Sequence, residues 1–137
     1  MTANFDYIVV GSGAAGAAAA WRFSEKNADV LILELGDYVN SNDYPTANKN
    51  WEQLKNAKFN AVASIRKGLH DYPVDDGDSP ISVCNFNAVG GSTILFSAHF
   101  PRFLRADFSI KTDHNIGVDW PISYDSLLPY FDINEKE

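Results

Sequence analysis

The feature that most constrains the fold is a glycine-rich turn that separates an apolar run from an alanine-rich run near the start of the chain. The apolar run comprises Phe5-Asp6-Tyr7-Ile8-Val9-Val10 and predicts a short buried strand. Residues 14–27 are rich in alanine, which favours a helix. A second apolar run occupies residues 30–33 and ends at Glu34-Leu35-Gly36. Strand, helix and strand in this order predict an α/β fold, with a βαβ unit over residues 5–36 and a parallel sheet.

The turn itself has the pattern G-x-G-x-x-G and comprises Gly11-Ser12-Gly13-Ala14-Ala15-Gly16. In a Rossmann-like unit the first glycine permits the tight turn, and the second lets the backbone approach a pyrophosphate. The third allows the helix to pack closely on the strand. Unpaired N–H groups and the positive dipole end at the helix start bind phosphate. The motif therefore predicts a dinucleotide site, and a purely structural glycine turn is the alternative.

An acidic residue stands where a dinucleotide site needs one. Glu34 ends the second predicted strand 18 residues after Gly16, where a carboxylate accepts the ribose hydroxyls, and Leu35 follows it. The alternative is an acid on the surface. An acid here disfavours a 2′-phosphate and hence NADP, but the βαβ unit alone does not choose between NAD and FAD. The unit begins at residue 5, as it does in many FAD-dependent oxidoreductases.

Composition narrows the function classes. The 137 residues carry 11 basic and 18 acidic side chains, a net charge of −7, which argues against a nucleic-acid-binding surface. The one cysteine, Cys84, rules out a disulfide framework and a cysteine-based zinc site, and we expect it to be buried as a small hydrophobe. We expect no metal site, no membrane segment and no export leader, and hence a soluble cytoplasmic protein.

Local patterns predict further elements between and after the motifs. Apolar residues recur at three- and four-residue steps over residues 51–69 and predict a helix. The aspartate-rich residues 71–78 lack the spacing of an EF-hand and predict an exposed acidic turn. Residues 81–86 predict a third strand. Ser123 is a candidate N-cap, and Pro129 predicts that the helix after it is short or broken.

A second glycine motif lies in residues 87–102 and contains Gly90-Gly91-Ser92-Thr93. Two glycines let the backbone lie against a flat ring or a diphosphate, while Ser92 and Thr93 can cap a helix and donate hydrogen bonds to anionic oxygen. The alternative is a tight turn capped by Ser92. A third recognisable segment, residues 119–131, begins with Asp119-Trp120-Pro121.

Together, segments 5–36, 87–102 and 119–131 resemble the N-terminal FAD-binding part of the glucose–methanol–choline (GMC) oxidoreductases, most of all the gluconate/fructose dehydrogenase-like branch. The resemblance implies that residues 1–137 are an incomplete FAD domain without the substrate domain. Residues of both glycine motifs, with Glu34, Leu35 and Phe96, would contact FAD. Phe96 stands where many members have asparagine, and an aromatic ring there could pack on the flavin. Leu95 stands where some members attach FAD through histidine, so the resemblance implies non-covalent FAD.

The resemblance also implies a reaction in which the flavin accepts a hydride from an alcohol or sugar CH–OH group. The catalytic histidine of the family lies near the C-terminus of much longer chains, and no residue here matches it, so we expect no catalytic residue in this chain. The helical pattern of the last segment continues to residues 134–137 without a stop signal, which favours a fragment of a longer enzyme. The alternatives are a non-catalytic dinucleotide-binding subunit that acts with a complementary chain, and another FAD enzyme that shares the first motif alone. Arg102, Arg105 and Lys111 could bind pyrophosphate or an acidic substrate, or be ordinary surface charges.

Overall fold

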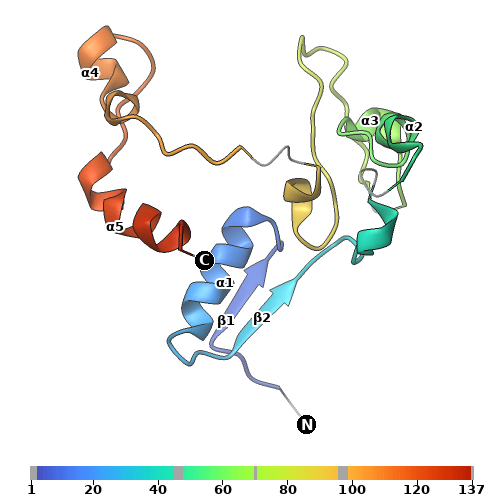
Figure 1. The fold of residues 1–137 in the computed structure, drawn as a ribbon, viewed down its shortest axis with the longest axis horizontal. Coiled ribbons are helices and arrows are strands. Elements are labelled where there is room, and N and C mark those ends of the chain that lie inside the picture. The colour runs from blue at the N-terminus through green and yellow to red at the C-terminus, as the bar shows by residue number, and fades with distance from the viewer. Residues whose placement is uncertain (1–2, 45–47, 70, 96–98, 137) are drawn as a thin grey trace. The chain divides into compact units, whose positions relative to one another are not determined.

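The computed structural model describes residues 3–44, 48–69, 71–95 and 99–136 (Figure 1). The chain divides into two compact units, one within residues 1–98 and one within residues 99–137. Each unit has its own contacts and is described by itself. Among the described residues, no helix is both long and apolar enough to cross a membrane.

The first unit is built on the expected βαβ arrangement. Strand β1 (Tyr7–Val10) leads through the glycine turn into helix α1 (Ala14–Ser24), which returns to strand β2 (Val30–Leu33). The two strands are parallel, with Tyr7 opposite Val30 and Val10 opposite Leu33. Figure 1 shows α1 beside this pair of strands. The prediction of a Rossmann-like α/β fold with a parallel sheet is confirmed, and α1 ends earlier than expected because Asn27 turns the chain with φ 58°.

The two faces of this small sheet differ in what covers them. Tyr7 faces α1, where its ring stacks on Phe23 with centroids 4.1 Å apart. Side chains alternate along a strand, so Ile8 and Val10 point to the opposite face, and they are 61% and 82% exposed. Leu33, the register partner of Val10, is exposed as well. Parallel strands are normally covered on both faces, so within the described residues this sheet has one open aliphatic face.

The helix expected over residues 51–69 is wrong in extent, because the segment forms two short helices. Helix α2 (Trp51–Asn56) and helix α3 (Ala63–Arg66) are separated by an irregular stretch; a 3₁₀ turn, η1 (Ser41–Asp43), precedes both. The Asn60 side chain accepts the backbone N–H of Val62 at 2.9 Å and so offers the backbone an alternative to the helix. The break also lets Phe59 turn inward, where it is almost completely buried against Phe86.

The third strand predicted over residues 81–86 is wrong, and so is the buried position of Cys84. The segment makes a single antiparallel bridge, between Val62 and Cys84, and Cys84 is exposed. The bridge cannot extend into a ladder because Val62 is followed directly by α3. The acidic turn before it is largely exposed, as expected, and in the described parts of the chain no three His, Cys, Asp or Glu side chains gather to hold a metal ion.

The second unit contains a 3₁₀ helix η4 (Arg105–Phe108), helix α4 (Ile110–His114) and helix α5 (Tyr124–Asn134). Phe108 is 6% exposed and contacts the rings of Phe103, Trp120 and Tyr124. These aromatic residues form the core of this unit.

Helix α5 begins as predicted but does not end as predicted. The Ser123 side chain caps it by accepting the N–H of Ser126, which confirms the expected N-cap. The helix then continues through Pro129, so the expectation of a short or broken helix is wrong. Ion pairs from Arg105 to Asp125 and from Arg102 to Glu135 lie on either side of the proline and add a little stability to the helix.

Candidate dinucleotide-binding site

The three glycines of the first motif have three different surroundings. Gly11 adopts φ +90°, which disfavours any residue with a Cβ. A Cβ on Gly13 would meet no atom within 4 Å, so this glycine leaves open space. A Cβ on Gly16 would lie 2.0 Å from the Gly11 carbonyl oxygen and 3.3 Å from Val9 Cγ1. The motif predicts these three roles: a tight turn at Gly11, open space at Gly13 and a close helix–strand contact at Gly16.

The start of α1 is open to an anion. Gly13 is its N-cap, with extended backbone at φ −64° and ψ −178°, and no described side chain caps the helix. No acidic side chain stands in its first turn, where Ala14 and Ala15 are exposed. An uncapped N-terminus of an 11-residue helix offers backbone N–H groups and the positive dipole end to a phosphate.

The Glu34 carboxylate is fixed by donors of the same turn. Its Oε2 accepts the backbone N–H and the hydroxyl of Ser12, both at 2.7 Å, and its Oε1 accepts the N–H of Gly36 at 3.0 Å. These bonds, first from Gly36 and then from Ser12, lower the pKa of Glu34 from 4.5 to about 2 against the opposing effect of burial. Oε1 keeps a second lone pair with which an ionised Glu34 can accept a hydroxyl donor. Leu35, which follows it, is exposed.

The second glycine motif packs directly on the first. Gly90 and Gly91 have φ +97° and +60° and lead into a 3₁₀ helix, η3 (Gly91–Ile94). The N–H of Gly90 donates to Ser12 Oγ at 3.1 Å, across 78 residues of sequence. A Cβ on Gly91 would lie 3.0 Å from Gly13 Cα. The structure thus brings together the two segments that the sequence predicts separately.

A further contact, which the sequence analysis missed, holds the approach to these motifs. A Cβ on Gly36 would lie 2.1 Å from the Asn87 carbonyl oxygen, so only glycine fits there. Beside it the N–H of Val89 donates to the Asp37 carbonyl at 3.1 Å. A glycine two residues after the acid that follows β2 is the signal that could have indicated this close approach.

Ser92 and Thr93 act differently from the prediction. Gly90, and not Ser92, is the N-cap of η3, so the predicted cap is wrong. The Ser92 hydroxyl accepts the N–H of Phe86 at 3.1 Å, and the Thr93 hydroxyl donates to the Gly90 carbonyl at 2.6 Å. Both bonds stabilise the turn and leave the Ser92 proton available to another acceptor. Phe96, predicted to pack on a flavin, lies outside the described residues.

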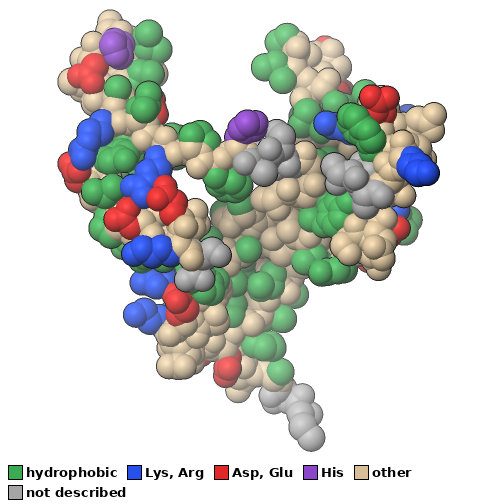
Figure 2. Space-filling model, in the orientation of Figure 1, with side chains coloured by type: hydrophobic (Ala, Val, Ile, Leu, Met, Phe, Trp, Pro, Cys, Tyr) green, Lys and Arg blue, Asp and Glu red, His purple; other side chains and the backbone are tan. Residues whose placement is uncertain are grey.

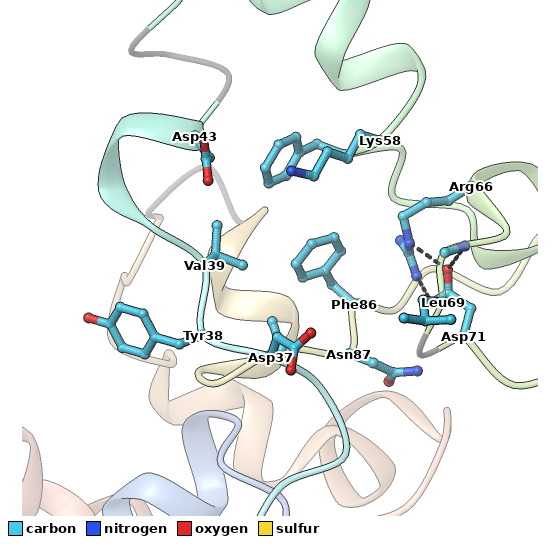
Figure 3. A pocket seen from close by; sticks show the side chains of 13 residues that line it. Asp37, Tyr38, Val39, Asp43, Lys58, Arg66, Leu69, Asp71, Phe86 and Asn87 are labelled. Atoms are coloured by element: carbon cyan, nitrogen blue, oxygen red, sulfur yellow. Dashed lines mark hydrogen bonds and ion pairs between the residues drawn. The ribbon is translucent and has the colours of Figure 1, made fainter.

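A cavity of about 330 Å³ adjoins this region (Figure 3). Asp37 and Asn87, which border the contact at Gly36, contribute to its wall, as do the apolar side chains of Val39 and Phe86. Arg66, on another side, pairs with Asp71 through its Nε at 2.9 Å and donates from Nη1 to the Asn85 carbonyl at 2.8 Å. The Arg66 guanidinium beside this cavity is therefore held by protein groups, and Asp71 balances its charge.

The arginines considered as a positive patch are also paired. Arg102 donates to Asp132 at 2.8 Å and to Glu135 at 2.5 Å, and Arg105 donates to Asp125 at 2.6 and 2.8 Å. These pairs lower the pKa of Glu135 and of Asp125. They favour the interpretation as surface charges that brace α5.

Residues 9–74 match the NAD(P)-binding Rossmann-like domain family. The chain is 35% identical over 132 residues to 2-methyl-1,2-propanediol dehydrogenase of Mycolicibacterium austroafricanum, covering 95% of this chain and 23% of that protein. It is 23% identical to the fructose dehydrogenase large subunit of Gluconobacter japonicus, covering 95% and 26%. It is 28% identical to the oxygen-dependent choline dehydrogenase of Staphylococcus saprophyticus, covering 99% and 24%.

The chain thus spans about a quarter of the length of these relatives, all of which are named as dehydrogenases. The matches extend over nearly all of its residues, including both glycine motifs, and the domain match covers the βαβ unit from β1 onward. With its parallel strands and G-x-G-x-x-G turn, the chain carries a Rossmann-like dinucleotide-binding domain, and its relatives over most of its length are GMC oxidoreductases.

Proposed function

We propose that this chain is the FAD-binding N-terminal part of an oxidoreductase that oxidises an alcohol or sugar CH–OH group by hydride transfer to the flavin. The observation that carries the proposal is the contact of the two glycine motifs at Ser12, where Gly90 N–H meets Ser12 Oγ. A flavin dinucleotide is long and has both a diphosphate and a second ring system. Two adjoining backbone surfaces without side chains suit such a ligand.

The residues present fit that cofactor without rearrangement of the turn. The open space at Gly13 and the uncapped start of α1 would hold the diphosphate, and Glu34 would accept a ribose hydroxyl. Gly91 and Ser92 would border the flavin end. FAD supplies the hydride acceptor when bound, while the protein supplies orientation. Leu95 has no nucleophile, which supports non-covalent binding. The base and the substrate pocket for the small alcohol or sugar would come from further polypeptide.

The cofactor is tested by purifying the intact protein and denaturing it with acid. We expect a yellow protein that releases FAD into the supernatant. A colourless protein that FAD cannot reconstitute, while NAD binds, contradicts the flavin. Flavin that stays with the precipitate contradicts non-covalent attachment.

A second candidate is a non-catalytic dinucleotide-binding subunit that acts with a complementary chain. The open aliphatic face formed by Ile8, Val10 and Leu33 favours it, because such a face needs a covering layer. Figure 2 shows hydrophobic side chains exposed at many places on the surface. The downstream nucleotide sequence separates the two. A reading frame that continues into a histidine-containing segment supports the enzyme, whereas a stop codon followed by a complementary frame supports the subunit.

A further inference from the structure

Ser12 belongs to the first glycine motif and contacts the second, and its side chain bonds to groups of the protein itself. It is 8% exposed. Its hydroxyl donates to Glu34 Oε2 at 2.7 Å and accepts the N–H of Gly90 at 3.1 Å. A serine hydroxyl has one proton to donate, so it cannot donate to a bound phosphate without releasing Glu34.

These two bonds join three parts of the site through one atom. Glu34 directly follows β2, Ser12 belongs to the turn before α1, and Gly90 is the N-cap of η3. The backbone N–H of Ser12 also donates to Glu34 Oε2, so the carboxylate is bound in one orientation by two donors. The N–H of Gly36 donates to the other oxygen, Oε1, so both oxygens of the carboxylate are held by the protein.

We propose that Ser12 is a positioning residue and not a direct cofactor ligand. Its hydroxyl orients the Glu34 carboxylate and ties the Gly90 turn to the first glycine motif before any ligand binds. The identity of the ligand, FAD, rests on the proposed function, but the two hydrogen bonds do not. The role differs from the expectation that Ser12 contacts the cofactor itself.

Three variants isolate the hydroxyl. Ser12→Ala removes both side-chain bonds and keeps the backbone N–H. Ser12→Thr keeps a hydroxyl at the same position. Ser24→Ala is the matched control, because Ser24 lies at the end of α1 and its hydroxyl donates to the Trp21 carbonyl, away from both motifs. Circular dichroism establishes that each variant folds.

The first test needs no ligand. Hydrogen–deuterium exchange of the intact protein is followed in the peptide that contains Gly90. In Ser12→Ala we expect exchange at the Gly90 amide to rise about tenfold, since a buried hydrogen bond of this kind is worth about 1–1.5 kcal/mol. Ser12→Thr restores protection and Ser24→Ala leaves it unchanged. Unchanged exchange in Ser12→Ala, or no restoration by Ser12→Thr, overturns the proposal.

The second test is a double-mutant cycle on FAD affinity, measured by titration of the apoprotein and flavin fluorescence. We expect Ser12→Ala to weaken binding about tenfold in the wild-type background, and by less than about threefold when Glu34→Gln is present, because the hydroxyl acts largely through Glu34. Equal losses in the two backgrounds mean that the hydroxyl does not act through Glu34, and they overturn the proposal. If the wild-type protein binds no FAD, the proposed function fails, and the exchange result alone decides the role of Ser12.

Discussion

The two units of the chain hold their parts together by different means. In the first, close contacts of backbone against backbone help to shape the site and are made possible by Gly16, Gly36 and Gly91. In the second, the contacts are between side chains, with aromatic rings around Phe108 and ion pairs from Arg102 and from Arg105. A close backbone contact leaves no space for an added atom unless the main chain moves. A side-chain contact can be weakened in steps, since a ring or a guanidinium can be replaced by a smaller group.

This difference follows from the kind of surface that each unit offers to a ligand. A site that receives a diphosphate needs bare N–H groups and room beside them, so side chains must be absent where the motifs meet. The aromatic unit presents no such surface, and its residues contribute through burial. Substitutions should therefore act abruptly in the first unit and gradually in the second.

The largest effect is expected from Gly16→Ala. The new Cβ would lie 2.0 Å from the Gly11 carbonyl oxygen, so α1 must move away from β1. We expect a loss of at least about 4 kcal/mol in the free energy of unfolding and no measurable dinucleotide binding. Chemical denaturation and cofactor titration measure these two losses.

Gly77→Ala is the matched control for that substitution. A Cβ there meets only Asp75 Oδ1, at 3.5 Å, which is ordinary contact. We expect no change in stability or in binding. If Gly16→Ala lowers stability and binding as little as Gly77→Ala does, the contrast between the backbone contacts of the first unit and the side-chain contacts of the second is wrong.

The next largest effect is expected from Phe108→Ala in the second unit. Removing a 6% exposed ring leaves Phe103, Trp120 and Tyr124 without their common neighbour, at a cost of about 3 kcal/mol. Hydrogen exchange should rise in peptides from residues 99–136 and stay unchanged in peptides from residues 5–36. Equal increases in both would show that the two units unfold together.

The same contrast explains how much of the structure could be predicted. The βαβ unit was predictable because its signals are local: apolar runs at the strands, alanine in the helix and glycine at the turn. The contact between Ser12 and Gly90 was not, since it joins residues 78 apart and depends on how the intervening chain folds. Gly90 and Gly91 indicated a turn, but only the fold shows that they lie against Ser12 and Gly13.

The failures of prediction lie where a single side chain redirects the backbone. Asn60 accepts the N–H of Val62 and interrupts a helical pattern that is otherwise regular. Cys84 sits in an apolar run, yet that run has one bridging partner and no sheet to join, so the cysteine is exposed. Periodicity reports which residues could be buried on one face, and it cannot report whether a partner for that face exists.

A smaller effect, dependent on pH, is expected from Glu34→Gln. The folded-state pKa of Glu34 is about 2, below its ordinary 4.5, so ionised Glu34 stabilises the fold above about pH 4.5 and this contribution is lost as the pH falls toward 2. An amide cannot satisfy the donors of both Ser12 and Gly36. We expect Glu34→Gln to be less stable than wild type by about 1–2 kcal/mol at pH 7.

The difference between the two proteins should shrink between pH 5 and pH 2, which denaturation at a series of pH values will measure. A constant difference across that range would mean that the charge of Glu34 does not contribute. Protonation of the other carboxylates affects both proteins equally, so it cancels in the difference between their stabilities.

The smallest effect is expected from Arg102→Gln, because Arg102 pairs with Glu135 at the C-terminal end of α5. Pro129 removes one bond from the middle of this helix, so its last turn relies on the ion pair between Arg102 and Glu135. Because the pair is exposed, we expect only a slight loss of overall stability, which disappears in about 0.5 M salt as the charges are screened. The local effect should be clearer: hydrogen exchange rises after Pro129 in Arg102→Gln but not in Arg105→Gln, whose partner Asp125 lies before the proline. Equal exchange in the two variants would mean that α5 behaves as one rigid rod despite Pro129, and that ion pairs here orient the helix without holding its turns.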